Sequence, residues 1–204
     1  MTKIKICGLS RPLDIEFVNE AHPDYIGFVF AKSKRQINRE QARQLKTMLN
    51  TDIQAVGVFV NEDIDNIIYL CNHNIIDIVQ LHGDEDKYYI SQLKKSVSKP
   101  IIKAARVKSA DDIHAAERLG TEYLLLDAYK EGQYGGSGDA FDWTMISDVK
   151  QPYFLAGGIH SENIMDAIMR VNPYAIDVSS GVETDGVKDR TKIIDIITKV
   201  RSVR

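Results

Sequence analysis

Two reactive side chains stand at the ends of apolar runs that lie far apart in the sequence. Cys7 ends the run Lys3–Cys7, and Asp127 follows three consecutive leucines. A thiolate can act as a base or as a nucleophile. A carboxyl group beside apolar walls tends to keep its proton, which suits a general acid. The alternatives are a thiol that only packs as a small hydrophobic group, and an aspartate that caps or pairs within the following loop.

Two segments rich in glycine and serine are candidate phosphate sites. Gly157-Gly158 and Ser179-Ser180-Gly181 each follow an apolar run near the end of the chain. Glycine lets the backbone approach a phosphate closely, and free amide groups donate to its oxygens. A tight turn would explain one such segment alone, but two of them after neighbouring runs favour phosphate binding.

Other site chemistries fit the sequence poorly. His82, Asp127 and Asp177 have no local spacing typical of metal ligands. A nucleophile elbow of the form G-x-S-x-G is absent, and the stretch Gly135–Gly138 lacks the G-x-G-x-x-G spacing of a dinucleotide site. We therefore expect neither a metal ion nor a dinucleotide. The glycine-rich stretch lies in a segment, residues 128–143, that can fold over a bound substrate.

The elements that must position these residues recur along the chain. Eight apolar runs start 22 to 30 residues apart, and stretches of helical periodicity separate them. Each interval holds one strand, one helix and two short loops. Eight such units predict an α/β fold, a single-domain (β/α)8 TIM barrel over residues 1–204, because closure removes exposed sheet edges. A doubly wound open sheet is the competing fold. The predicted strands are Lys3–Cys7, Tyr25–Phe30, Gln54–Val60, Asp77–Leu81, Ile101–Ala105, Tyr123–Asp127, Tyr153–Ala156 and Ala175–Ser179.

In such a barrel, chemistry belongs where the strands end and the loops to the helices begin. Polar, titratable or glycine residues gather after the predicted strand ends and not before the strand starts, which favours an enzyme. Three helix starts are predicted from capping side chains. Asn61, Ser161 and Asp189 each precede an apolar stripe at helical spacing.

Composition excludes several classes of function. The 204 residues carry 26 Lys and Arg against 29 Asp and Glu, a net charge of −3, which gives no basic surface for nucleic acid or an anionic membrane. Cys7 and Cys71 do not make a disulfide framework, and Cys71 lies on a predicted apolar helix face, where it should only pack. Without a signal peptide or an apolar span, we expect a cytoplasmic protein, monomer or homodimer.

Taken together and in order, these motifs resemble the phosphoribosylanthranilate isomerase family of tryptophan biosynthesis. The resemblance spans residues 3 to 190. One departure is Asp139-Ala140, where the family usually has Lys-Thr, and this puts a charge role of that loop in doubt. The matching stretches are Lys5–Gly8, Gly27–Phe30 with Ser33–Arg35, Val56–Asn61, Val79–Gly83, Leu125–Asp127, Gly135–Gly138 with Phe141–Trp143, Ala156–Ile159 and Asp177–Glu183.

The resemblance implies an Amadori rearrangement of N-(5-phosphoribosyl)anthranilate to 1-(2-carboxyphenylamino)-1-deoxyribulose 5-phosphate. It implies that Asp127 is the general acid and Cys7 the general base, and that no cofactor is needed. Arg35 would hold the anthranilate carboxylate, because a planar guanidinium binds carboxylates in a bidentate manner. The implied supporting roles are substrate orientation by His82 and Asp177 and phosphate binding by Gly157, Gly158, Ser179, Ser180 and Gly181.

Two alternatives stay open from the sequence. The first is another phosphate-binding barrel, such as a pentulose-phosphate epimerase or a neighbouring synthase of the same pathway. An epimerase would need metal ligands, which are not evident. The second is a sensor of phosphorylated metabolites on the same scaffold. A sensor would need only the phosphate and carboxylate contacts, so an acid and a base at the strand ends argue against it.

Overall fold

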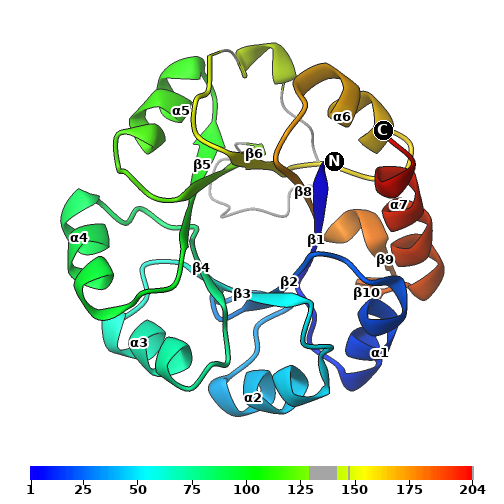
Figure 1. Ribbon diagram of the computed structural model, residues 1–204, viewed down its shortest axis with the longest axis horizontal. Helices are drawn as coiled ribbons and strands as arrows, with labels where there is room; N and C mark the ends of the chain where they lie inside the picture. Colours follow the sequence, from blue (N-terminus) through cyan, green and yellow to red (C-terminus); the bar gives the residue numbers. More distant parts are fainter. Residues whose placement is uncertain (129–141, 147, 204) are drawn as a thin grey trace.

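The computed structural model describes residues 1–128, 142–146 and 148–203. Eight parallel strands close into a barrel in sequence order, with the last strand pairing to the first (Figure 1). The predicted (β/α)8 TIM barrel is therefore confirmed, and the open doubly wound sheet is excluded. The strands are β1 Lys3–Cys7, β2 Tyr25–Val29, β3 Gln54–Phe59, β4 Ile78–Leu81, β5 Ile101–Val107, β6 Tyr123–Ala128, β7 Tyr153–Leu155 and β8 Ala175–Val178.

Helices form a ring around this barrel (Figure 1). Their buried apolar side chains pack against those of the strands. The described helices are α1 Pro12–Ala21, α2 Arg39–Met48, α3 Ile64–Asn72, α4 Lys87–Ser96, α5 Ala110–Glu117, α6 Ile164–Val171 and α7 Arg190–Ser202. Shorter elements are the 3-10 turns η1 Trp143–Met145 and η2 Ser180–Val182, and the small hairpin of β9 Glu183–Thr184 and β10 Val187–Lys188. The turn η2 and the hairpin of β9 and β10 lie between β8 and α7.

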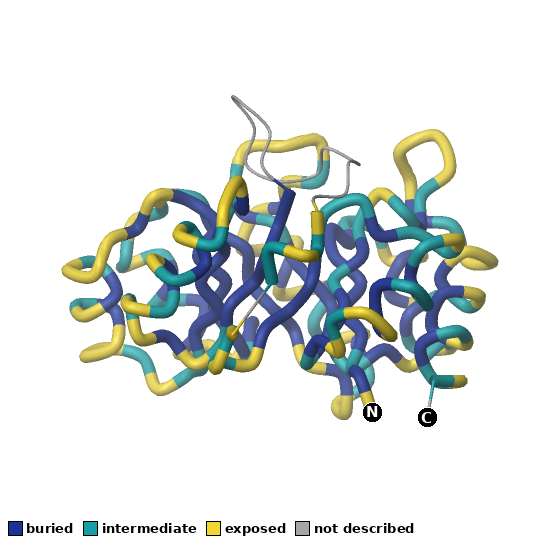
Figure 2. The backbone as a smooth tube through the Cα atoms, turned by 90° about the horizontal axis from the view of Figure 1, so that it is seen from above, coloured by how far each residue is buried: buried dark blue, intermediate teal, exposed yellow. Residues whose placement is uncertain are grey.

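Two apolar layers hold the fold together. The larger layer lies between the strands and the surrounding helices. The smaller layer fills the inside of the barrel, because side chains alternate between the two faces of each strand. Its members are Tyr25, Val56, Ile78, Ile102, Ala104, Leu125, Phe154, Ala156 and Ala175. Figure 2 shows buried chain running through the middle of the molecule and exposed chain around the outside.

The predicted strands coincide with the observed ones to within two residues at each end. Two of the three predicted caps are wrong. Asp63, not Asn61, caps α3, since its side chain accepts from the amide of Asp65. Asn61 instead takes a left-handed backbone, φ 48°, and its side chain accepts from the amide of Asp84 in the next loop.

The other two caps give one correction and one confirmation. Asn163 stands at the N-cap of α6, and the hydroxyl of Ser161 instead bonds Asp195 of α7. Asp189 caps α7 as predicted, since its side chain accepts from the amides of Thr191 and Lys192. The two termini lie on the same face of the molecule (Figure 2). No helix in the described part of the chain is long and apolar enough to cross a bilayer.

Candidate active site

Four of the predicted site residues lie on the inner side of the barrel, at the carboxyl ends of their strands. Leu125 and Ala175 belong to the inner apolar layer. Two positions further along the same strands, Asp127 and Asp177 therefore also face inward. Asp177 bonds Lys5 on β1, so Lys5 faces inward too, and Cys7 follows two positions later. His82 joins them through its bond to Asp127.

On the side of the site that carries Asp127, three side chains are joined by hydrogen bonds. The Gln80 amide Nε2 lies 2.8 Å from Nδ1 of His82, and Nε2 of His82 lies 3.2 Å from Oδ2 of Asp127. The backbone amide of Ala128 donates to Oδ1 of Asp127 at 2.9 Å. All three side chains are buried. These hydrogen bonds engage both oxygens of Asp127 and so fix the orientation of its carboxyl group.

Gly157 is required beside this carboxyl group. Its φ is +81°, in the left-handed region, and a Cβ there would lie 2.6 Å from the amide nitrogen of Ala128 and 2.9 Å from Oδ1 of Asp127. No side chain fits in that space without moving the acid. The loop after β7 therefore packs directly against the end of β6.

On the side of the site that carries Cys7, the neighbouring side chains are charged. Lys5 Nζ lies 3.0 Å from Oδ2 of Asp177, and the Lys5 side chain is completely buried. Burial alone would lower the pKa of Lys5, but the charge of Asp177 and the Cys7 thiol together hold it above its ordinary value. Burial raises the pKa of Cys7, and Lys5 opposes that shift. Gly27 of β2 pairs with Cys7 of β1. A Cβ on Gly27 would lie 2.6 Å from the thiol sulfur, so the glycine leaves room for the thiol.

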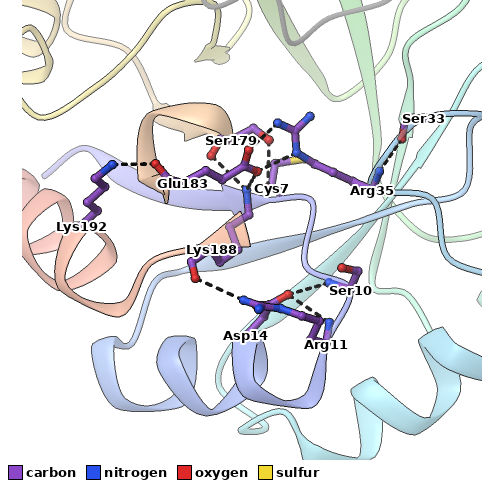
Figure 3. A network of polar contacts seen from close by, with 10 residues as sticks. All are labelled: Cys7, Ser10, Arg11, Asp14, Ser33, Arg35, Ser179, Glu183, Lys188 and Lys192. Atoms are coloured by element: carbon purple, nitrogen blue, oxygen red, sulfur yellow. Dashed lines mark hydrogen bonds and ion pairs between the residues drawn. The ribbon is translucent and has the colours of Figure 1, made fainter. Parts of the chain in front are cut away.

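Arg35, the predicted carboxylate-binding residue, already holds a carboxylate of the chain itself. Its Nε and Nη2 donate to the two oxygens of Glu183, each at 2.7 Å (Figure 3). The buried Lys188 donates to the same carboxylate at 2.6 Å and to the carbonyl of Ser179 at 2.9 Å. Burial would raise the pKa of Glu183, but the hydrogen bond from Arg35 and the charge of Lys188 hold it below its ordinary value.

The arginine reaches Glu183 by passing over Gly8. A Cβ at Gly8 would lie 2.4 Å from Cδ of Arg35, and the backbone there has φ +85°. The side chain therefore runs across the end of β1, next to Cys7, as Figure 3 shows. Burial lowers the pKa of Lys188, which is the second cation at this carboxylate.

The two predicted phosphate segments lie side by side. A Cβ on Gly181 would lie 2.1 Å from the carbonyl oxygen of Ile159, so η2 packs closely on the loop after β7. Gly158, next to Gly157, also has a left-handed backbone, with φ +63°. The hydroxyl of Ser179 donates to the carbonyl of Cys7 at 3.1 Å and joins this loop to β1. Gly157, Gly158, Ser180 and Gly181 thus come together at one edge of the barrel mouth.

Four residues of this region were missed from the sequence: Lys5, Gln80, Glu183 and Lys188. Lys5 and Gln80 could have been found, because each lies two positions before a predicted site residue and so shares the inward face with it. Glu183 belongs to the last matching stretch but had no assigned role. No local signal marks Lys188, whose partners are set by the turn of the hairpin.

Two further expectations concern metals and the long loop. In residues 1–128, 142–146 and 148–203, no group of three or more His, Cys, Asp or Glu side chains is placed to hold a metal ion. The segment Gly135–Gly138 and the Asp139-Ala140 departure lie outside the described residues. Closure of the 128–143 loop over substrate stays a prediction. Asp142, just after the gap, accepts from the amide of Thr144 at the start of η1.

Comparisons with known proteins agree on one family. The model of the family described as N-(5'phosphoribosyl)anthranilate (PRA) isomerase matches residues 4–199. A relative named N-(5'-phosphoribosyl)anthranilate isomerase, from Endomicrobium trichonymphae, is 51% identical over 203 residues, with 100% of both chains covered. The crystal structure of phosphoribosyl anthranilate isomerase from Thermotoga maritima superposes with a TM-score of 0.89 at 34% identity, again with 100% of both chains covered.

A second solved structure carries a ligand. It is phosphoribosyl anthranilate isomerase in complex with reduced 1-(o-carboxyphenylamino)-1-deoxyribulose 5-phosphate, with a TM-score of 0.85, 34% identity and 100% of both chains covered. The ligand's name includes a phosphate and a carboxyphenyl group. These similarities extend over the whole barrel and include both strands that carry Cys7 and Asp127.

Proposed function

Because this chain belongs to the N-(5'-phosphoribosyl)anthranilate isomerase family, we propose that it catalyses the Amadori rearrangement of N-(5-phosphoribosyl)anthranilate in L-tryptophan biosynthesis. The product is 1-(2-carboxyphenylamino)-1-deoxyribulose 5-phosphate. One observation carries the assignment of roles: a thiol on β1 and a hydrogen-bonded carboxyl group on β6 both face the inside of the barrel at its carboxyl end. Cytoplasmic location and a monomeric or homodimeric state stay predictions.

The reaction moves protons between a base and an acid. Asp127 gives its proton to the furanose ring oxygen, the C1–O bond breaks, and an iminium forms between C1 and the substrate nitrogen. The thiolate of Cys7 takes the proton from C2, whose electrons neutralise the iminium and give an enolamine. Tautomerisation, in which C1 gains a proton and the C2 hydroxyl loses one, gives the ketone. The substrate nitrogen is the electron sink, so atoms and charges balance without a cofactor.

The other predicted residues hold the two ends of the substrate. Arg35 binds the anthranilate carboxylate, and Glu183 keeps its guanidinium in place beside Cys7. The phosphate binds to the backbone around Gly157, Gly158, Ser180 and Gly181, with Ser179 tying that loop to β1. The close packing of Gly181 on the loop after β7 supports this assignment, because it brings the two glycine-containing segments together.

His82 and Asp177 orient the sugar. Oδ1 of Asp177 is buried and has no hydrogen-bond partner in the described part of the chain. A buried carboxylate oxygen without a donor costs free energy, and a hydroxyl of the ribose would satisfy it. His82 lies between Gln80 and Asp127, so it acts on the substrate next to the acid.

The test is the loss of the fluorescent anthranilate-linked substrate, followed for wild type, Cys7→Ala and Asp127→Asn. Each variant is expected to lower kcat at least about a hundredfold, the lower end of acid and base contributions. Near-normal turnover in either variant would refute its assigned role. Tight binding of substrate analogues without turnover by the wild type would instead indicate a sensor, and activity lost to a chelator would indicate a metal-dependent enzyme.

A further inference from the structure

Lys5 places a fully buried ammonium group inside the barrel, directly below the mouth that carries Cys7. Its side chain has no exposed surface, and its ammonium group lies 3.0 Å from Oδ2 of Asp177. Lys5 and Asp177 are register partners across the β1–β8 pairing, which closes the barrel. Cys7 stands two positions beyond Lys5 on the same strand and on the same face.

A buried ion pair is a poor source of stability in a barrel interior. Apolar residues fill much of the barrel interior, including Val56, Ile102 and Leu125. Replacing a buried ion pair by apolar residues of similar volume is often neutral or stabilising, because two charges no longer lose their hydration. A charged pair in this position therefore points to a role in chemistry.

The pair is also incomplete. Asp177 holds Lys5 with Oδ2, while its other oxygen, Oδ1, is buried and has no partner among the described residues. The carboxylate is thus only partly used by the ammonium.

The charges that act on Cys7 come from several elements of the site. Among the charges that favour the thiolate of Cys7, that of Lys5 has the largest effect and that of Lys188 the next largest. The charge of Asp177 favours the neutral thiol. The positive charge of Arg35 also interacts with Cys7. Arg35 and Lys188 share Glu183 as their carboxylate, whereas Lys5 alone pairs with Asp177. The groups that face the thiol are Lys5 from β1, Asp177 from β8, Arg35 from the loop after β2, Lys188 from β10 and, behind these two cations, Glu183 from β9.

We propose that Lys5 is a positioning residue whose buried ammonium stabilises the thiolate of Cys7, so that the base is available at a lower pH than burial alone would allow. Its catalytic consequence rests on the proposed function, in which Cys7 removes the C2 proton. The electrostatic effect itself does not, because it can be measured on the free enzyme. Asp177 keeps the ammonium in place and retains one oxygen for the substrate.

The test is a titration of the thiolate by its ultraviolet absorbance in wild type and in Lys5→Met, which removes the charge at nearly constant length. Each spectrum is corrected with the same protein carrying Cys7→Ala, which leaves Cys71 as the remaining thiol. The subtraction also removes the signal of Cys71, whose pKa burial raises to about 11. The Cys7 midpoint in Lys5→Met is expected about one pH unit or more above wild type, which is about tenfold less thiolate at a given pH.

Lys103→Met/Glu85→Gln is the matched control, since Lys103 is another buried lysine that pairs with a carboxylate, and the second substitution leaves no buried charge unpaired. It is expected to leave the Cys7 midpoint unchanged. Should Lys5→Met fold poorly with Asp177 unpaired, Lys5→Met/Asp177→Asn removes both charges and is still expected to raise the midpoint relative to Asp177→Asn alone. Superposable titrations of each variant and its reference would overturn the proposal. Normal turnover by Cys7→Ala would defeat the proposed function and leave this electrostatic result standing.

Discussion

Two of the buried lysine–carboxylate pairs in the described part of the chain, Lys103–Glu85 and Lys5–Asp177, differ in how completely they are satisfied. Lys103 Nζ lies 2.9 Å from Oε2 of Glu85 and 2.6 Å from the carbonyl of Gly83. The carboxylate of Glu85 also accepts from the amides of Gly83 and Asn61. In the other pair, Lys5 bonds one oxygen of Asp177, and the second oxygen is unpartnered in the described part of the chain.

The two pairs also lie on opposite faces of the sheet. Ile102 belongs to the layer inside the barrel, so its neighbour Lys103 faces outward, where it holds the loop between β4 and α4. Lys5 faces inward, below the thiol. A complete pair outside the barrel fixes a loop, and an incomplete pair inside it keeps hydrogen-bonding capacity for a ligand. Burial and charge do not distinguish these two pairs, but the unpartnered oxygen of Asp177 does.

The largest expected effect that sharpens this comparison is on stability. Lys103→Met leaves the buried Glu85 without its cation and is expected to lower the free energy of unfolding by about 3–5 kcal/mol, which denaturant titration measures. Lys103→Met/Glu85→Gln, which keeps an acceptor for the amides but removes the charge, should recover most of the loss. If Lys103→Met were as stable as wild type, the outer pair would not fix its loop.

A smaller effect is expected at the acid, whose support is a neutral amide and not an ion pair. Gln80→Met removes the contact that orients His82, and through it the bond to Asp127. We expect kcat to fall about tenfold, below the usual contribution of a full acid, with KM nearly unchanged in steady-state assays. Ile102→Val is the control for packing in the same layer, at a cost of about 0.5–1.5 kcal/mol in stability. An equal fall of kcat in that control would assign the effect to packing.

The smallest expected effect is a pH dependence of the free energy of unfolding, caused by Glu183, the third carboxylate of the site. Its pKa is lowered in the folded protein, so it contributes stability above its unfolded value of about 4.3, and this contribution is lost as pH falls through the folded pKa. The difference in free energy of unfolding between wild type and Glu183→Gln should therefore shrink on acidification below about pH 4.3. Denaturant titrations at several pH values measure it. A difference that stays constant with pH would show that Glu183 contributes no such linkage.

Local patterns predicted most of the fold. Each strand is a short apolar run, and the runs recur at nearly constant spacing, so the structure agrees with the sequence to within two residues at strand ends. The caps at Asn61 and Ser161 were wrong because the path of the loop decides which side chain meets the first turn. Asn61 faces the neighbouring loop, and Ser161 faces α7.

The partners of the site residues could not be predicted in the same way. Lys5 and Asp177 are 172 positions apart, and Arg35 and Glu183 are 148 apart. Such contacts depend on the register with which the barrel closes and on the turn between β9 and β10, which a single sequence does not show. The identities of Cys7 and Asp127 were visible at strand ends, but the charges and amides that support them were not.

The seam between β1 and β8 has a consequence for synthesis on the ribosome. The first strand carries the thiol and its ammonium, and the last strand brings the carboxylate of Asp177 and the hydroxyl of Ser179 that bonds the Cys7 carbonyl. Contacts between residues so far apart in the chain form late, because loop closure must precede them. A nascent or truncated chain that stops before Ala175 thus carries both reacting side chains but lacks the counter-charge that seats the lysine. Catalytic competence and completion of the ring therefore arrive together.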